Sequence, residues 1–208
     1  RHAGPTLRSS DLEASIETDG KVADAASIPI GIRKVEIDAA QGLRINGESH
    51  KLRGGCVHHD NGPLGSACIA RAEERRVELL KASGFNAIRT SHNPPSPDFL
   101  DACDRLGMLV IDEAFDAWTR GKNPQDYNLY FKDWWQRDIE AMVKRDRNHP
   151  SIVLWSIGNE IPERAEPEGV ALGHQLAAHV KQFAAPRTVP AAICAPWDHP
   201  HQTWKDVQ

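Results

Sequence analysis

The chain has 208 residues, a length that suggests one domain or one and a half. Of these residues 40% are hydrophobic and 26% are charged, which is typical of a globular protein. Its net charge of −4 argues against a nucleic acid or an anionic membrane as partner, because both require a concentrated basic face. No apolar run approaches the roughly 20 residues of a membrane-spanning helix. The amino terminus lacks a Met and the plan of a signal peptide, so we expect an internal part of a longer protein, whose localisation stays open.

The cysteines argue against a metal centre. They are widely spaced and no two form a CxxC pair: Cys56, Cys68, Cys103 and Cys194. This spacing fits neither a zinc site nor a disulfide framework, so we expect neither. No cofactor is expected. Cys103 lies at helical spacing from Phe99 and Leu100 and is predicted to be a small buried residue.

The first part of the chain is predicted to be β structure. Residues 11–31 alternate apolar and polar side chains across the turn "TDGK", which is a hairpin signal. Residues 33–48 repeat the plan, with turns at "AAQG" and "NGE". We expect residues 1–48 to contain the last strands of a β-sandwich and a connecting ribbon.

The rest of the chain alternates strands and helices. Strands are predicted at residues 51–59, 85–91, 108–115, 151–160 and 188–194, and helices at residues 71–84, 96–107, 130–150 and 166–184. The second helix begins with Ser96 as its N-cap and Pro97 at its first position. This alternation predicts an α/β fold with a parallel sheet and right-handed crossovers, either a doubly wound sheet or a (β/α)8 barrel.

Polar residues at the strand ends favour the barrel. The first four of these strands end on "HHD", "RTSHN", "DEAFDAW" and "GNE". In a barrel the carboxyl ends of all strands meet at one mouth, where barrel active sites lie. The loop "HHDNGPLG" after the first strand does not match the glycine-rich phosphate loop of dinucleotide-binding sheets. Residues 49–208 are therefore predicted to be the first half of a TIM barrel.

The strand at residues 151–160 ends unusually, on an amide and a carboxylate, Asn159 and Glu160. A lone Glu is usually a surface ion-pair partner or a carboxylate at a helix amino terminus. A carboxylate beside an apolar wall, however, has a raised pKa and can donate a proton near neutral pH. An adjacent amide can hold a sugar hydroxyl. The pair therefore indicates a general acid for glycoside cleavage.

Three segments resemble successive signatures of glycoside hydrolase family 2: "LRGGCVHHDNGPLG", "NAIRTSHNPPSPDFLDACDRLGMLVIDEAF" and "RDRNHPSIVLWSIGNE". The match runs from about Arg33 to Glu160, and the family holds β-galactosidases, β-glucuronidases and β-mannosidases. The segments "HHD" and "DEAFDAW" are similar to those of the bacterial β-galactosidase branch of the family. The resemblance implies that residues 1–48 end an immunoglobulin-like domain and that residues 49–208 begin the catalytic barrel.

The resemblance also implies roles for individual residues. Glu160 matches the general acid/base, and Asn159 matches the residue that bonds the sugar 2-hydroxyl. Arg89 and His92 match a pair that lines the sugar subsite, with Arg89 orienting the carboxylates. His58 matches a histidine that contacts sugar hydroxyls. Taken singly, each histidine would more often be an ordinary core or surface residue.

Other strand-end residues receive weaker assignments. Asp60 is a second candidate for sugar contact after His58, and His59 is left undecided. Trp118 is predicted to bind substrate as a stacking platform, and Asp116 to reach the same subsite, with packing under a loop as the alternative for both. Trp134 and Trp135, in a long helix, are predicted to be core residues.

The adjacent carboxylates Asp112 and Glu113 could suggest a two-carboxylate mechanism, but the resemblance implies instead that they form a structural network under the site, bonded to Arg89 or its neighbours.

Two features depart from the family pattern. The magnesium-binding Glu-x-His of some family β-galactosidases is replaced by "FDAWTRG", so no such metal site is expected. The family's nucleophile, a second Glu on strand seven, is expected to lie outside this chain.

The sequence as a whole predicts a retaining β-glycoside hydrolase, a β-galactosidase acting on terminal β-D-galactose. The alternatives are a β-glucuronidase or β-mannosidase of the same family, or a truncated fragment that binds sugar or assembles without hydrolysis. The expected partners are a carbohydrate substrate and either a second copy of the chain or the remainder of the enzyme. Residues 1–208 alone are expected to be inactive and marginally folded, since a barrel sheet left open exposes unpaired strand edges.

Overall fold

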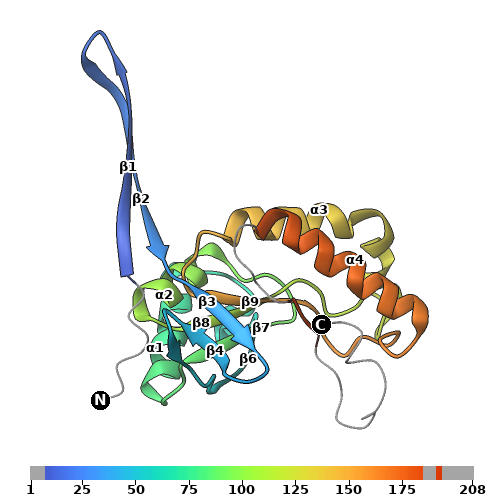
Figure 1. Cartoon of the computed structure of the whole chain (residues 1–208). Coiled ribbons are helices and arrows are strands. Elements are labelled where there is room, and N and C mark those ends of the chain that lie inside the picture. Colours follow the sequence, from blue (N-terminus) through green and yellow to red (C-terminus); the bar gives the residue numbers. More distant parts are fainter. Residues whose placement is uncertain (1–7, 185–190, 194–208) are drawn as a thin grey trace.

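A computed structural model describes residues 8–184 and 191–193 of the chain. The described part contains an antiparallel hairpin, a small antiparallel sheet, and a parallel sheet with four helices (Figure 1). The β-rich beginning and the later strand–helix alternation therefore match the order that the sequence predicts. None of the described helices combines the length and the apolar character that a membrane crossing requires.

The hairpin consists of β1 (Arg8–Thr18) and β2 (Lys21–Ile32), and it projects away from the rest of the structure (Figure 1). Its turn places Asp19 and Gly20 in the left-handed region, with φ of 52° and 72°, as two-residue hairpin loops require. Leu12 and Ile28 face each other across the strands and are 50% and 48% exposed. An apolar face of this kind is typical of sandwich strands. The immunoglobulin-like assignment of residues 1–48 stays a prediction.

A small antiparallel sheet packs against the amino ends of the parallel strands. It is formed by β3 (Val35–Asp38), β4 (Gly42–Ile45) and β5 (Glu48–Ser49). Ile45 is 2% exposed and packs in one apolar cluster with Ala87, Leu109 and Val153, which lie at or next to the first residues of three parallel strands. The segment predicted as a connecting ribbon thus covers the amino ends of the strands and leaves their carboxyl ends to form the site.

The parallel sheet contains β6 (Gly54–His58), β7 (Ala87–Ser91), β8 (Leu109–Glu113), β9 (Ile152–Gly158) and β10 (Ala191–Ile193). A short 3-10 turn, η1 (Gly62–Leu64), and the helices α1 (Ala70–Ala82), α2 (Pro97–Leu106), α3 (Asn128–Asp146) and α4 (Pro167–Ala184) connect them. The strands lie side by side in chain order. A doubly wound sheet reverses its order at a switch point, whereas a barrel adds each new strand on the same side. The observed order confirms the (β/α)8 barrel fold.

Local sequence explains where the helices begin and end. At α2, the Ser96 side chain accepts a hydrogen bond from Phe99 N at 3.2 Å, and Gly107 ends the helix with a left-handed φ of 68°. Cys103 is fully buried on the inner face of α2, as predicted, and burial raises the pKa of its thiol.

The two adjacent tryptophans of α3 have different environments. Trp135 packs against the main apolar core, as predicted. Trp134 is 43% exposed and carries the Arg137 guanidinium 4.5 Å above its ring, so the core prediction for Trp134 is wrong. One residue corresponds to about 100° of helix rotation, which is enough to turn one of two neighbours out of the core.

The first parallel strand offers a sharp test of packing. A Cβ on Gly54 would lie 1.8 Å from the backbone oxygen of Ala87 on β7, whereas a Cβ on Gly55 would meet only the Phe85 ring at 3.8 Å. We expect Gly54→Ala to lower the free energy of unfolding by about 3 kcal/mol, the upper end of typical overpacking costs. Gly55→Ala should change it by less than about 1 kcal/mol. Denaturant titration of both variants checks the difference, and equal effects would contradict the close approach of β6 and β7.

Candidate active site

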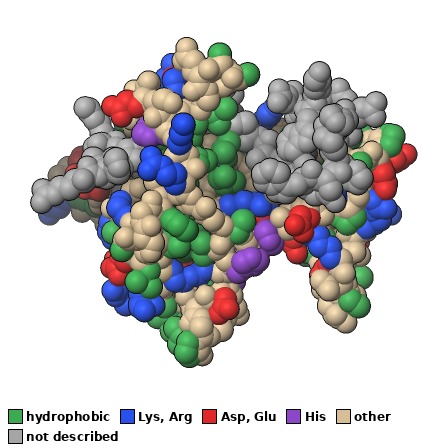
Figure 2. Space-filling view, turned by 90° about the horizontal axis from the view of Figure 1, so that it is seen from below, with side chains coloured by type: hydrophobic (Ala, Val, Ile, Leu, Met, Phe, Trp, Pro, Cys, Tyr) green, Lys and Arg blue, Asp and Glu red, His purple; other side chains and the backbone are tan. Residues whose placement is uncertain are grey.

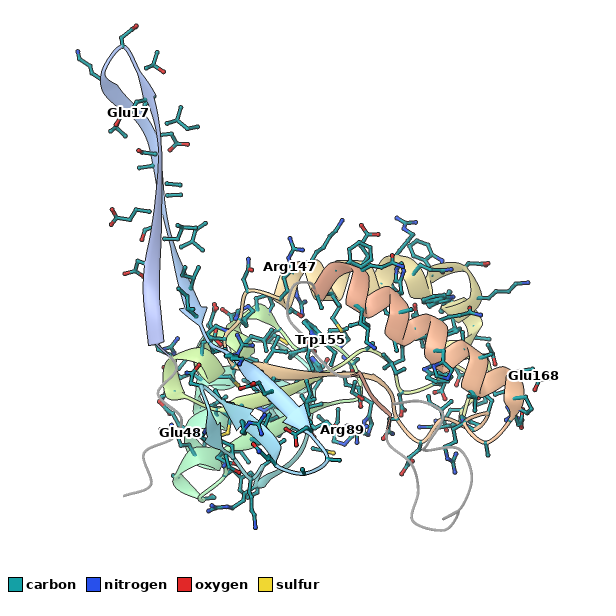
Figure 3. The ribbon with its side chains drawn as sticks, viewed as in Figure 1. Glu17, Glu48, Arg89, Arg147, Trp155 and Glu168 are labelled. Atoms are coloured by element: carbon teal, nitrogen blue, oxygen red, sulfur yellow. The ribbon has the colours of Figure 1, made fainter. Side chains whose placement is uncertain are left out.

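A buried carboxylate collects hydrogen bonds at the carboxyl ends of the strands. Glu113, the last residue of β8, is 0% exposed. It accepts hydrogen bonds from Arg89 Nε of β7 at 2.7 Å and from Ser156 Oγ of β9 at 2.6 Å. Its other oxygen lies 2.7 Å from Nδ1 of His92, just beyond β7. Residues from three neighbouring strand ends therefore meet at one carboxylate, and Figure 3 labels Arg89 among these strands.

Asn159 is held at both ends of its amide. Its Oδ1 accepts a hydrogen bond from Arg89 Nη2 at 3.1 Å, and its Nδ2 donates to Asp116 Oδ1 at 2.8 Å. Lys122 Nζ donates to Asp116 at 2.6 Å and to the Asn159 backbone oxygen at 2.9 Å. Partial burial raises the pKa of Asp116, but the hydrogen bonds from Lys122 and Asn159 outweigh it and hold that pKa below its usual value. The amide orientation is thus fixed before any ligand binds.

Glu160 lies directly beyond this network and differs from the sequence expectation. Its side chain is exposed, so the apolar wall predicted beside it is not formed by the described residues. Its φ of 45° is left-handed, an uncommon conformation for a residue other than Gly. Strained residues of this kind persist where their surroundings hold them, often at functional sites. The Lys122 contact to the preceding carbonyl is one such restraint.

Two histidines meet at the same strand ends. The rings of His58, the last residue of β6, and His92 are in edge-to-face contact, with centroids 5.0 Å apart. His59 lies beside them, with its Nδ1 3.2 Å from Asn93 Nδ2, and its burial lowers the pKa of the imidazole. Figure 2 shows histidine side chains gathered near the middle of one face, with acidic and basic side chains close by.

Trp118 and Asp60, which were both predicted to contact the substrate, make hydrogen bonds outside the Glu113 network. Trp118 is 1% exposed and donates from Nε1 to the Ile157 backbone oxygen at 2.8 Å. A ring so deeply packed has no open face for a sugar, so the structure supports the alternative of packing under a loop. Asp60 accepts a hydrogen bond from Gly62 N at 2.8 Å within its own loop. This contact shapes the turn after β6 and does not join Asp60 to the Glu113 network.

Asp112 and Glu113 were expected in one network, but they point to opposite sides of β8. Asp112 is also 0% exposed, and neither of its oxygens has a hydrogen bond of normal geometry. Burial, followed by the neighbouring Asp146 carboxylate, raises the pKa of Asp112 well above its ordinary value. Asp146 itself pairs with Arg145 Nε at 2.5 Å. Of the two adjacent acids, Glu113 alone joins Arg89.

The raised pKa of Asp112 predicts a pH-dependent stability. A carboxyl group with a higher pKa in the folded state stabilises the fold below its unfolded pKa, near 3.9, and loses that contribution as pH rises through the folded pKa. Asp112→Asn cannot ionise, so its stability relative to the parent should increase from pH 4 to pH 8. Urea unfolding across this range measures the difference, with the exposed Asp133→Asn as a control expected within about 0.5 kcal/mol. A pH-independent difference for Asp112→Asn would contradict the assignment.

In the segment "FDAWTRG" (residues 115–121), which replaces the magnesium-binding Glu-x-His, Phe115 and Asp116 contact other side chains. Phe115 is 4% exposed and stacks on Tyr127 with centroids 5.0 Å apart. Asp116 is held by Lys122 and Asn159. Among the described residues, one trio has ligand atoms close enough for a metal, Asp101, Asp104 and His149. Within that trio, Asp104 already bonds His149 Nδ1 at 2.7 Å and so connects α2 to the start of β9.

Sequence reasoning missed two residues of the network, Ser156 and Lys122. Ser156 was detectable, because it is a polar residue inside an apolar strand, two positions from Gly158. Lys122 lies in the irregular segment between β8 and α3, where neither periodicity nor spacing predicts contacts. Both act by positioning Glu113, Asp116 and the end of β9.

Parallel strands in chain order, with a polar cluster at their carboxyl ends, define a (β/α)8 barrel with a site at its mouth. The chain belongs to glycosyl hydrolase family 2: the model of that family's TIM barrel domain matches residues 35–192.

The chain is similar to several members of the family. It is 50% identical over 141 residues to the β-galactosidase BoGH2A of Bacteroides ovatus, covering 68% of this chain and 17% of that protein. It is 45% identical over 160 residues to a putative β-glucuronidase of Formosa agariphila, covering 76% of this chain and 15% of that protein. The crystal structure of a family 2 member from Bacteroides cellulosilyticus aligns with a TM-score of 0.83 and 51% identity, over 90% of this chain and 24% of that one. The chain therefore spans less than a quarter of each of these relatives.

Proposed function

We propose that this chain supplies part of the active site of a retaining β-glycoside hydrolase, a β-galactosidase. The observation that carries the proposal is the network in which Arg89 joins Glu113 to Asn159 directly beside Glu160. A site that must orient a sugar needs donors and acceptors fixed in advance, because ordering them during the reaction costs free energy. Family membership and the similarity to a β-galactosidase support the same activity.

In this proposal Glu160 is the general acid/base. It protonates the glycosidic oxygen as the leaving group departs and later takes a proton from the water that attacks the glycosyl-enzyme. Its exposed position at the strand end suits a group that must reach both a leaving group and water. The nucleophile is a second carboxylate outside this chain, about 5–5.5 Å from Glu160 in a retaining enzyme.

Asn159 holds the 2-hydroxyl of the sugar, a contact that strengthens in the transition state. Because Arg89 and Asp116 fix both ends of its amide, the group is oriented without the sugar. Glu113 and Lys122 are positioning residues in this scheme, since they act on the sugar through Arg89 and Asn159.

His92 and His58 contact the sugar hydroxyls. With Nδ1 of His92 donating to Glu113, its Nε2 is an acceptor and is available to a hydroxyl. The edge-to-face contact of the two rings keeps His58 at the same strand ends. Replacement of either histidine should therefore weaken substrate binding through lost hydroxyl contacts.

Substrate preference tests the sugar assignment. We expect a higher kcat/KM on a nitrophenyl β-galactoside than on the matching β-glucuronide or β-mannoside. This expectation rests on the resemblance of the segments "HHDNGPLG" and "DEAFDAW" to β-galactosidases and on the similarity of the chain to BoGH2A. Steady-state kinetics of a polypeptide that carries this chain within a complete barrel measures kcat/KM for each of the three substrates. A preference for the β-glucuronide would favour the activity given to the Formosa agariphila relative.

A further inference from the structure

Two loops at the carboxyl ends of the strands are joined through one buried carboxylate. The loop after β8 contains Thr119 and Arg120, and the loop after β9 contains Glu160 and, three residues later, Glu163. Glu163 is 4% exposed. Its Oε1 accepts hydrogen bonds from Thr119 N at 2.8 Å, from Thr119 Oγ1 at 2.6 Å and from Arg120 N at 3.3 Å. One oxygen on the loop that carries Glu160 therefore collects three donors of the neighbouring loop.

The Glu163 carboxylate keeps its charge despite its burial. Burial raises the pKa of Glu163, but the hydrogen bonds from Thr119 and from the backbone outweigh it and hold that pKa below its usual value. The Arg120 guanidinium adds an ion pair, with Nε 3.6 Å from Oε2. Hydrogen bonds to an ionised acceptor are roughly twice as strong as those between neutral groups. The two loops are therefore held together more firmly than a neutral side chain would allow.

The backbone on both sides of Glu160 is also closely packed. Ile161 is 0% exposed, and a Cβ on Gly158 would lie 2.7 Å from Ile161 Cγ1, so Ile161 packs directly on the end of β9. A Cβ on Gly169 would lie 1.9 Å from the backbone oxygen of Glu163, so α4 approaches the loop equally closely. Glu160, with its left-handed φ of 45°, thus lies between fixed residues while its own side chain is exposed.

We propose that Glu163 is a positioning residue for the general acid/base Glu160. The inference rests on the proposed function, because Glu160 needs accurate placement only if it transfers protons. A general acid must lie within hydrogen-bond reach of the oxygen that it protonates. Glu163 does not contact the sugar in this scheme. It fastens the loop that carries Glu160 to the loop after β8, and so sets where the Glu160 carboxyl group lies.

Three variants isolate this effect. Glu163→Ala removes the acceptor, whereas Glu163→Gln keeps an oxygen that can accept the same hydrogen bonds. Among the described residues no donor bonds Oε2 of Glu163, so the amide nitrogen can take its place without breaking a hydrogen bond. Glu166→Ala is the matched control, because Glu166 lies on the same loop, pairs with the same Arg120 at 2.6 Å and is exposed.

The experiment measures kcat and KM on aryl β-galactosides with leaving groups of increasing pKa, using the polypeptide that carries this chain within a complete barrel. For Glu163→Ala we expect kcat/KM to fall roughly 10–100-fold for poor leaving groups, since a displacement of about 1 Å can cost 10²-fold. For an activated leaving group kcat/KM should change little, while kcat and KM fall together, because the glycosyl-enzyme then waits for its base. Glu163→Gln should restore most of the loss, and Glu166→Ala should match the parent.

A purely structural role of Glu163 gives a different result. Loss of folded enzyme would lower kcat equally for every leaving group and leave KM unchanged. If Glu163→Ala does not fold, Thr119→Val takes its place, because Thr119 is exposed and valine has the same shape without the hydroxyl donor. Thr119→Val should then show the same dependence on the leaving group, with a smaller loss.

The outcomes separate the two proposals. If Glu160→Ala shows the expected dependence on the leaving group but the folded Glu163→Ala behaves as the parent, or loses activity equally on all substrates, the positioning role is overturned and the proposed function stands. The same holds for a parent-like Thr119→Val where that variant is the one tested. A parent that hydrolyses no β-galactoside, or a Glu160→Ala variant without that dependence, refutes the proposed function and this inference with it.

Discussion

Replacing Glu160 by Ala should lower kcat/KM roughly 10²–10⁴-fold for β-galactosides with poor leaving groups, the usual worth of general acid–base help. The loss should be much smaller for activated aryl glycosides, whose leaving groups depart without protonation. Glu160 is exposed at the end of β9, so its removal should not disturb the buried network. A series of aryl β-galactosides with leaving groups of increasing pKa measures the dependence.

The matched control is Glu168→Ala, an exposed carboxylate in the first turn of α4. It should change kcat/KM by less than twofold for every leaving group, because it lies outside the network of Arg89, Glu113 and Asn159. An equal loss across all leaving groups in Glu160→Ala would argue for a binding or structural role instead of proton transfer.

Replacing Glu113 by Ala should lower the free energy of unfolding by about 3–5 kcal/mol, as when one partner of a buried ion pair is removed. The carboxylate is 0% exposed and accepts hydrogen bonds from Arg89 and Ser156. Its removal leaves the Arg89 guanidinium, 17% exposed, without its closest counter-charge. Denaturant titration measures the stability, and kcat/KM should fall with it because Arg89 then no longer fixes Asn159.

The control for this effect is an exposed ion pair. Glu166 pairs with Arg120 at 2.6 Å, and both side chains are about half exposed, at 50% and 49%. Glu166→Ala should therefore change the free energy of unfolding by less than about 1 kcal/mol. A similar small effect for Glu113→Ala would mean that the buried network does not hold the strand ends together.

The fold could be predicted from the sequence where local signals are strong. The beginning of helix α2 was placed by Ser96 as its N-cap and Pro97 at its first position, since these residues satisfy the start of the helix locally. The location of polar residues at strand ends was sufficient to favour the barrel. The environments of Trp118 and Trp134 were not predictable, because burial of a large ring depends on which distant residues pack against it.

The site could be predicted where its residues lie at the ends of strands. Position at a strand end brings Arg89, His92 and Asn159 together, so the sequence identified them correctly as neighbours. Successive residues of a strand point to opposite faces of the sheet. This alternation could have predicted that Asp112 and Glu113 lie on opposite sides of β8 and do not share one network. The contact of Lys122 depends on the path of an irregular loop, which no local pattern encodes.

The most direct test of the account is the reaction of the Glu160→Ala variant with azide. If Glu160 is the acid/base of a retaining enzyme, azide attacks the glycosyl-enzyme in place of base-activated water, restores turnover of an activated aryl galactoside and yields a β-galactosyl azide. Nuclear magnetic resonance of the product identifies its anomeric configuration. Rescue with a β-configured azide is the predicted result. No rescue, or an α-configured product, would contradict the assignment of Glu160 and the retaining mechanism together.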